Sequence, residues 1–122
     1  MAVDCRPEDL IELLGGYRFT TSGERELQEA LWRVFEEREL GPQREVILDT
    51  HARIDFLLPG GLGVEVKIQG STSDVRRQVE RYMAFEAIRS VVVITTKSKH
   101  LQLPRELGGK PLFVVCLDGS AF

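Results

Sequence analysis

Charged residues occur in the middle of the chain, where the sequence pattern predicts β-strands. Asp55 lies in one predicted strand, and Glu65 and Lys67 lie in the next. Because strand side chains point alternately to the two faces of a sheet, Glu65 and Lys67 share one face and their apolar neighbours share the other. Asp55 likewise faces away from Ile54 and Phe56. The pattern therefore predicts two acids and a lysine on one side of a strand pair.

The turn between these strands decides whether the two carboxylates meet. If the hairpin turns about Gly60, residues pair when their numbers add up to 120, and Asp55 then lies opposite Glu65. Opposed carboxylates, with Cβ atoms about 5 Å apart, repel each other unless a cation lies between them. A hard divalent metal suits such a pair, since Mg²⁺ takes one or two carboxylates plus waters and phosphate oxygens. The alternative is a hairpin with one solvated face, on which charged side chains simply point outward. A register different by one residue would also separate the carboxylates.

A third acid precedes the strands, in a predicted helix. The apolar stripe at positions 27, 31, 34 and 35 has the spacing of one helix face. Glu24 falls within this stripe, whereas Glu26 and Glu29 point away from it. Glu24 is therefore placed to reach across to the sheet. The alternative is a role at the helix start, because residues 21–24 (TSGE) match the capping box, and the two roles are compatible.

A later predicted helix carries polar side chains along an apolar stripe. Gln78 and Tyr82 lie one turn apart, on the same side as Val75 and Val79. A lone tyrosine in such a stripe more often belongs to the core. The same helix also carries three arginines, Arg76, Arg77 and Arg81. Guanidinium groups suit phosphate oxygens, and amide and hydroxyl groups commonly join them, so the set indicates contact with phosphate.

The elements that must position these residues predict an α/β fold in one domain over residues 1–122. Helices are expected at 7–14, 22–40 and 74–89, and strands at 46–48, 53–58, 63–68, 91–95 and 112–115. Continuous apolar runs indicate that the last two strands are buried in the centre of the sheet. The order α-α-β-β-β-α-β-(α)-β combines a hairpin with a right-handed helical crossover. It implies a mixed sheet with helices packed on it.

Composition places the chain among soluble globular proteins. It has 122 residues, of which 43% are hydrophobic and 29% charged, which is too apolar for a disordered chain. No apolar run approaches the roughly 20 residues of a membrane span, and the N-terminal residues do not resemble a signal peptide. Cys5 and Cys116 form no CxxC pair. A reducing, cytoplasmic setting is expected.

The formal net charge of −3 conceals an uneven distribution. Residues 1–66 carry 7 basic and 14 acidic side chains, and residues 67–105 carry 8 basic and 3 acidic ones. This fits a polyanion-binding face beside a metal-binding centre, and it equally fits two halves of a solvated surface. The histidines, His51 and His100, lack a partner pattern and are not assigned to metal.

These pieces together resemble the PD-(D/E)xK nuclease superfamily over roughly residues 23–96. Residues 23–28 (GERELQ) resemble the first-helix acid motif of archaeal-type Holliday junction resolvases and RecB-like nucleases. Asp55 followed by Glu65-Val66-Lys67 matches the signature acid and E-x-K. Residues 78–82 (QVERY) match the Q-x-x-x-Y motif of RecB-type and lambda-exonuclease-type members. Ile54 stands in place of the signature Pro, a position at which many members vary.

The resemblance implies a restriction-endonuclease-like fold and a metal-dependent deoxyribonuclease. Asp55, Glu65 and the Val66 carbonyl would hold Mg²⁺ or Mn²⁺, with Glu24 joining directly or through water. Lys67 would orient or help deprotonate the attacking water and steady the charge on the phosphate. The expected catalytic set is Glu24, Asp55, Glu65, Lys67, Gln78 and Tyr82, and the expected DNA-binding residues are Arg76, Arg77, Arg81 and Lys97.

A homodimer is expected, because 122 residues offer little surface to hold a duplex. Two other functions stay open at this point. One is a DNA-binding relative that has lost catalysis. The other is a structural or protein-interaction domain, in which the charged hairpin is merely solvated.

Overall fold

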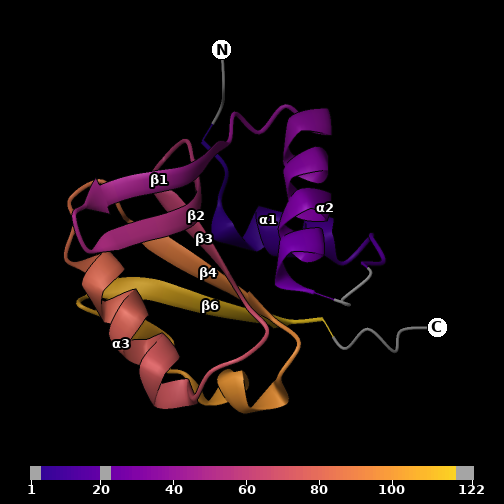
Figure 1. Cartoon of the computed structure of the whole chain (residues 1–122). Coiled ribbons are helices and arrows are strands. Elements are labelled where there is room, and N and C mark those ends of the chain that lie inside the picture. Colours follow the sequence, from indigo (N-terminus) through magenta and orange to yellow (C-terminus); the bar gives the residue numbers. More distant parts are fainter. Residues whose placement is uncertain (1–3, 20–22, 118–122) are drawn as a thin grey trace.

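Helices and short strands follow one another along residues 4–19 and 23–117, which are the residues that the structure describes. Figure 1 shows their arrangement in this computed structural model. The elements are α1 (Pro7–Leu14), α2 (Glu24–Glu37), β1 (Gln43–Asp49), β2 (Ala52–Leu58), β3 (Leu62–Lys67), α3 (Thr72–Met83), β4 (Ser90–Thr95), the 3-10 helix η1 (Ser98–Gln102), β5 (Glu106–Leu107) and β6 (Lys110–Cys116).

The strands form one mixed sheet in the order β1-β2-β3-β4-β6-β5. β1, β2 and β3 pair antiparallel, whereas β4 lies parallel to both β3 and β6. Helix α3 connects β3 to its parallel neighbour β4, as such a crossover requires. The mixed α/β sheet that the sequence predicts is confirmed.

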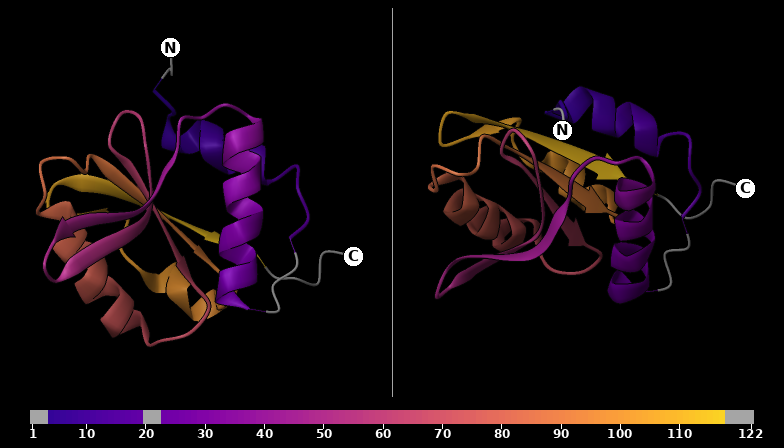
Figure 2. Two further views of the ribbon diagram at one scale, coloured as in Figure 1. Left: turned by 45° about the horizontal axis from the view of Figure 1, so that its top comes forward. Right: turned by 90° about the horizontal axis from the view of Figure 1, so that it is seen from above.

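Helices cover both faces of the sheet (Figure 2). Each face has its own apolar core. Leucines of α1 and α2 pack with Val64 and Val66 of β3 on one face. On the other face, Val75 and Val79 of α3 pack with Val91 and Val93 of β4. Every residue of β4 is buried, which agrees with its continuous apolar sequence. The sheet therefore separates α2 from α3, and β3 lies against both cores.

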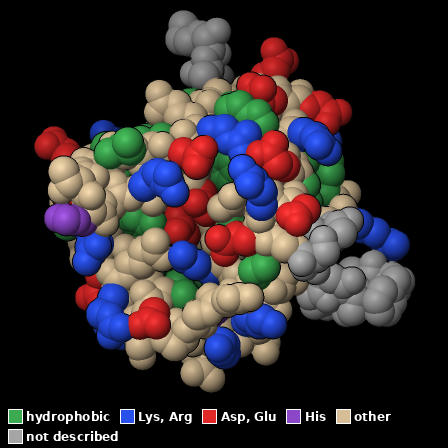
Figure 3. Space-filling model, in the orientation of Figure 1, with side chains coloured by type: hydrophobic (Ala, Val, Ile, Leu, Met, Phe, Trp, Pro, Cys, Tyr) green, Lys and Arg blue, Asp and Glu red, His purple; other side chains and the backbone are tan. Residues whose placement is uncertain are grey.

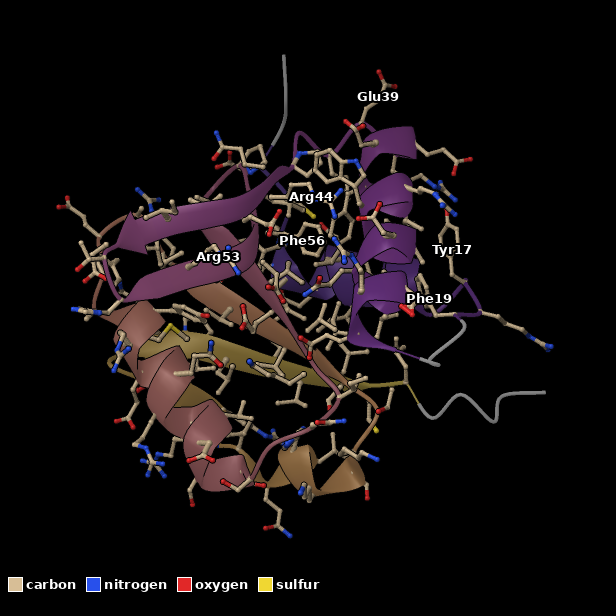
Figure 4. All side chains as sticks on the ribbon, viewed as in Figure 1. Tyr17, Phe19, Glu39, Arg44, Arg53 and Phe56 are labelled. Carbon is tan, nitrogen blue, oxygen red and sulfur yellow. The ribbon has the colours of Figure 1, made fainter. Side chains whose placement is uncertain are left out.

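Helix α2 is fixed to the β1–β2 hairpin by aromatic and charged contacts (Figure 4). Phe56 of β2 packs edge-on against Phe35, with ring centroids 5.2 Å apart. The guanidinium of Arg44 lies 4.8 Å from the centroid of the Trp32 ring and also pairs with Glu29. The sequence pattern places Glu29 away from the apolar stripe, and its carboxylate is used to bind the hairpin. These contacts hold α2 beside the end of the hairpin that is away from its turn, where Arg44 pairs with Phe56.

The helices begin and end near the predicted positions, with two clear differences. Helix α1 has the predicted bounds. Helix α2 ends at Glu37 rather than at 40, because Glu39 adopts a left-handed conformation with φ of 55°. Helix α3 ends at Met83 rather than at 89, because the next buried apolar residue, Ile88, does not continue the helical spacing. None of the described helices combines the length and the apolar character that a membrane crossing requires.

Two features of the strands were not predicted. β1 is longer than the expected segment at 46–48 and pairs with β2 as far as Gln43. The short strand β5 pairs with the start of β6 across Gly108 and Gly109, whose φ values are 59° and 78°. Two consecutive positive φ angles suit a two-residue hairpin turn, which glycine adopts without strain. The optional helix after β4 is the 3-10 helix η1.

Candidate active site

The β2–β3 hairpin has the register that a turn about Gly60 predicts. Phe56 pairs with Val64 and Leu58 pairs with Leu62, so the residue numbers add up to 120. The regular pairing stops at Phe56, although β2 begins at Ala52 and β3 continues to Lys67. The two strands therefore diverge one residue beyond the last pair, at the level of the two predicted acids (Figure 1).

Asp55 and Glu65 replace the missing strand pairing with their own carboxylates. The backbone N–H of Val66 donates to Oδ2 of Asp55 over 2.8 Å. The backbone N–H of Asp55 donates to Oε1 of Glu65 over 3.2 Å. Each carboxylate thus satisfies a backbone donor on the opposite strand, which fixes both side chains in the space between the strands. The two acids therefore lie across from each other as the turn predicts, but through these hydrogen bonds and not as a pair in the strand register.

β2 also changes its packing partners at Asp55. Ile54 belongs to the core beneath α3, whereas Phe56 belongs to the core beneath α2. Two residues that strand alternation places on the same side of β2 therefore pack into different cores. Glu45 of β1, at the level of Asp55, has φ of 50°, which is rare for a residue with a side chain. This local distortion bends the hairpin, and Asp55 lies where β2 passes from one core to the other.

Glu65 is almost fully enclosed, with 2% of its surface exposed. Its Oε2 accepts a hydrogen bond from the Tyr82 hydroxyl at 3.1 Å and lies 3.5 Å from Nζ of Lys67. Burial, followed by the nearby charge of Asp55, raises the pKa of Glu65 to about 7, while Lys67 acts in the opposite direction. The ammonium of Lys67 therefore offsets only part of the cost of ionising this carboxyl group.

Asp55 receives its remaining contacts from helix α2. Burial raises the pKa of Asp55, and the hydrogen bonds from the Val66 N–H and the Gln28 side chain lower it. The charge of Glu24 raises it further, which places Glu24 within electrostatic reach of Asp55. Sequence reasoning did not assign Gln28. Its position four residues after Glu24, on the same helix face, is the signal that identifies it.

Glu24 does not have the capping-box role that the sequence offers as an alternative. The N-cap of α2 is Gly23, so Glu24 is the first helical residue and Glu26 is the third. A Cβ atom added to Gly23 would lie 2.7 Å from Oε1 of Glu26, so this carboxylate folds back over the helix start. Glu26 thus occupies the position of a capping-box acid. Thr21 and Ser22 lie outside the described residues.

Tyr82 and Gln78 support Glu65 rather than facing solvent. Tyr82 is 1% exposed, and its hydroxyl oxygen lies 2.9 Å from the carbonyl oxygen of Arg53. Nε2 of Gln78 donates to the same hydroxyl over 2.8 Å. Neighbouring protein groups thus enclose the Tyr82 hydroxyl, and contact of Tyr82 with phosphate stays a prediction. Tyr82 and Gln78 hold Glu65 in place and are positioning residues.

The donor chemistry of the site suits a hard divalent cation. Two carboxylates are sufficient protein ligands for Mg²⁺, which completes its shell with water and substrate oxygens. The Val66 carbonyl belongs to the same strand as Glu65. In residues 4–19 and 23–117, no three His, Cys, Asp or Glu side chains form a group able to hold a metal ion. The charge of Glu24 acts on Asp55, and a direct or water-mediated role of Glu24 at a metal stays a prediction.

The predicted DNA-binding residues lie on exposed surface. Arg76 pairs with Glu80 at 3.7 Å, and Arg77 pairs with Asp74. Arg81 instead donates to the backbone carbonyl of His51, with an N···O distance of 3.0 Å. Lys97 is exposed in the loop after β4. On the face of the molecule that is seen in Figure 1, Figure 3 shows acidic side chains gathered in the middle, with Lys and Arg side chains around them.

Comparison with known proteins adds no relative to this description. No protein-family model, no curated protein and no solved structure matches the chain.

Proposed function

We propose that this chain is a metal-dependent deoxyribonuclease of the PD-(D/E)xK type, with a restriction-endonuclease-like arrangement of sheet and helices. It hydrolyses phosphodiester bonds during DNA repair, recombination or replication processing. The observation that supports this most strongly is the Asp55–Glu65 pair, fixed by reciprocal backbone hydrogen bonds where β2 and β3 diverge, with Lys67 beside it. A hairpin that was merely solvated would not bury an acid to 2% exposure beside a second acid.

The carboxylate pair supplies the ligands for Mg²⁺ or Mn²⁺ in this proposal. Asp55, Glu65 and the Val66 carbonyl hold the ion, and Glu24 contributes through its charge or through water. When bound, the metal lowers the pKa of a water molecule and offsets negative charge on the scissile phosphate. The raised pKa of Glu65 supports this assignment, because a neighbouring cation would stabilise the ionised form of the buried carboxyl group.

Lys67 has the proton-handling and charge-stabilising role. Its ammonium is held 3.5 Å from Oε2 of Glu65 and 24% of its side chain is exposed, so it borders both the carboxylate pair and solvent. There it orients or helps deprotonate the attacking water and stabilises charge that develops on the phosphate. Tyr82 and Gln78 keep Glu65 in position throughout. DNA is bound by the basic residues around the site, and the working unit is a cytoplasmic homodimer.

Substitution of Lys67 by alanine tests this function directly. Purified protein is incubated with linear, circular, single-stranded and branched DNA, with Mg²⁺, with Mn²⁺ and with a chelator. The wild-type protein is expected to cleave at least one of these substrates only when divalent metal is present. Lys67→Ala should lower the single-turnover rate by about 10²–10³ or more, because the ammonium stabilises charge mainly in the transition state. DNA affinity measured in Ca²⁺ should remain close to that of the wild type, since one cation is a small share of the phosphate contacts.

Two matched variants complete this experiment. Lys67→Arg should not restore cleavage, because a planar guanidinium does not occupy the place of a compact ammonium. Lys99→Ala removes the same charge from an exposed position and should cleave like the wild type. Folding of each variant is checked by circular dichroism. A folded Lys67→Ala protein that cleaves at the wild-type rate would contradict the site assignment. Salt-dependent DNA binding without any cleavage would assign the chain to non-catalytic DNA binding.

A further inference from the structure

A second concave surface adjoins the candidate active site. It is a cavity of about 350 Å³ between the β1–β2 turn and helix α3. We call it the basic groove, and the side chains at its rim are His51, Arg53, Asp74, Arg77 and Arg81. Gln78 and Tyr82 also line it, and these are the residues that position Glu65. The basic groove and the candidate site therefore share a wall.

The basic groove carries a positive charge on balance. Three arginines and one aspartate line it, and one of the arginines, Arg53, also lies 3.8 Å from Glu45 of β1. Asp74 is paired with Arg77. Arg81, by contrast, is held by a neutral group, the backbone carbonyl of His51. A guanidinium carries five N–H donors, so one hydrogen bond to a carbonyl leaves it able to bind further oxygens and leaves its charge uncompensated there.

The kind of ligand follows from the lining. The ring of Tyr82 is buried, and the exposed part of the lining consists mainly of guanidinium groups together with the imidazole of His51. Guanidinium groups recognise phosphate oxygens through paired hydrogen bonds. Arg53 precedes Asp55 by two residues on β2, a distance of about 7 Å along an extended strand. A chain of phosphates lying in the basic groove would therefore continue toward the carboxylate pair.

We infer that the basic groove binds the phosphate backbone of the substrate DNA strand beside the candidate active site. Arg77 and Arg81 contact the phosphates, and Arg53 lies on the side nearer Asp55. The identity of the ligand as DNA rests on the proposed function. The inference also separates the arginines of α3, because Arg77 and Arg81 line the basic groove and Arg76 does not. The sequence pattern alone does not distinguish the three.

DNA affinity across a range of salt concentrations tests this assignment. A fluorescein-labelled DNA duplex is titrated with protein in Ca²⁺, and binding is followed by anisotropy. The double variant Arg77→Gln/Arg81→Gln removes both charges, while glutamine at 81 keeps a donor for the His51 carbonyl. It should bind at least tenfold more weakly. The slope of log affinity against log salt should become shallower by about 0.9 for each phosphate that the protein no longer neutralises.

Three comparisons make the result decisive. Arg76→Gln, one position away on the same helix, should keep the wild-type affinity and slope. Arg77→Lys/Arg81→Lys keeps the charges and should recover most of the affinity and all of the slope. In cleavage reactions, Arg77→Gln/Arg81→Gln should need more enzyme to reach its maximal single-turnover rate, and that maximal rate should match the wild type. This distinguishes a binding surface from the catalytic site.

The outcomes separate this inference from the proposed function. Wild-type affinity and slope in Arg77→Gln/Arg81→Gln, or an equally weakened Arg76→Gln, would reject the basic groove while leaving cleavage intact. The expected weakening in a protein that never cleaves DNA would support the basic groove and reject the nuclease. A wild-type protein that binds no DNA would reject the groove assignment outright.

Discussion

At the scale of single residues, burial and ionisation of Glu65 oppose each other. In the unfolded chain its carboxyl group titrates near 4.5, whereas in the folded protein its pKa is about 7. Between these pH values the unfolded state releases the proton and the folded state keeps it. The contribution of this group to the free energy of unfolding is therefore largest below pH 4.5. It falls as the pH rises to about 7 and is constant above that pH. Burial also raises the pKa of Asp55, which adds to the same trend.

Removing the charge of Glu65 should stabilise the metal-free protein at alkaline pH. Glu65→Gln keeps the shape of the side chain and cannot ionise, so above pH 7 it should raise the free energy of unfolding by about 1–3 kcal/mol. Near pH 4.5 the variant and the wild type should be equally stable. Urea unfolding between these pH values, in the presence of a chelator, measures the difference. The exposed acid Glu26 provides the control through Glu26→Gln. If the free energy of unfolding changed with pH in the same way in the wild type and in Glu65→Gln, the raised pKa of Glu65 would be contradicted.

The raised pKa of Glu65 also predicts how metal binding depends on pH. A cation held by Asp55 and Glu65 must displace the proton of Glu65, so its affinity should rise as pH increases toward about 7. Binding to the folded state alone raises stability by mass action. The melting temperature should therefore increase in millimolar Mg²⁺ or Mn²⁺, and more at pH 8 than at pH 6. Calorimetry should show binding that Asp55→Asn abolishes. A melting temperature independent of both ions, without heat of binding, would remove the metal site.

At the scale of elements, the β2–β3 hairpin could be predicted because its register depends on local sequence. Gly60 and Gly61 have φ values of 89° and 76°, so the glycines that suggested the turn are required there. The opposition of Asp55 and Glu65 follows from that turn alone. The divergence of the strands could not be predicted in this way, because it arises from the bend in β1 and from the packing of two separate cores.

The roles of the helices were harder to predict from the sequence. Periodicity identified the buried face of α3 and the alignment of Gln78 with Tyr82. It could not show that the Tyr82 hydroxyl meets Glu65, because their contact joins residues 17 positions apart. For α2, the start of the helix was misplaced by a matching cap motif. A shift of two residues at that end, from an N-cap at 21 to Gly23, moves the capping-box acid from Glu24 to Glu26.

The contact between α3 and Glu65 makes Tyr82→Phe an informative variant. The Tyr82 hydroxyl favours the ionised form of Glu65, so its removal should raise the pKa of Glu65 further. The acid limb of the pH–rate profile for DNA cleavage should then move to higher pH. Gln78 loses its acceptor, which should lower the free energy of unfolding by about 1–3 kcal/mol.

Carboxyl ¹³C NMR of Glu65 measures the pKa independently of activity. Tyr17→Phe, on the far side of α2, should leave the Glu65 titration unchanged, and an unaltered pKa in Tyr82→Phe would contradict the positioning role.

At the scale of the whole molecule, the distribution of charge matters more than its sum. The chain has a net charge of −3, so its overall charge does not attract a polyanion. The carboxylate pair lies between α2 and α3, and the arginines that line the basic groove lie directly beside it. A phosphate chain that enters from the basic groove meets attraction first and repulsion at Asp55 and Glu65. Without a cation there, the site opposes the substrate that its surroundings attract.

Neutralising the two carboxylates should therefore substitute for a divalent ion in DNA binding. In a chelator, the wild-type protein should bind labelled duplex DNA weakly, and Ca²⁺ should strengthen this binding. At pH 8, above the pKa of Glu65, Asp55→Asn/Glu65→Gln removes two negative charges at the site, so it should bind DNA in the chelator as tightly as the wild type does in Ca²⁺, and Ca²⁺ should add little.

The matched control changes net charge by the same amount elsewhere. Glu36→Gln/Glu37→Gln alters two exposed acids in the last turn of α2, distant in sequence from Glu24 and Gln28 at the site. Because salt screens exposed charges within about 10 Å at 0.1 M, this variant should retain the wild-type dependence on Ca²⁺. If both double variants strengthen binding equally, net charge alone governs the interaction. If neither does, DNA does not approach the carboxylate pair, and the proposed path from the basic groove to Asp55 fails.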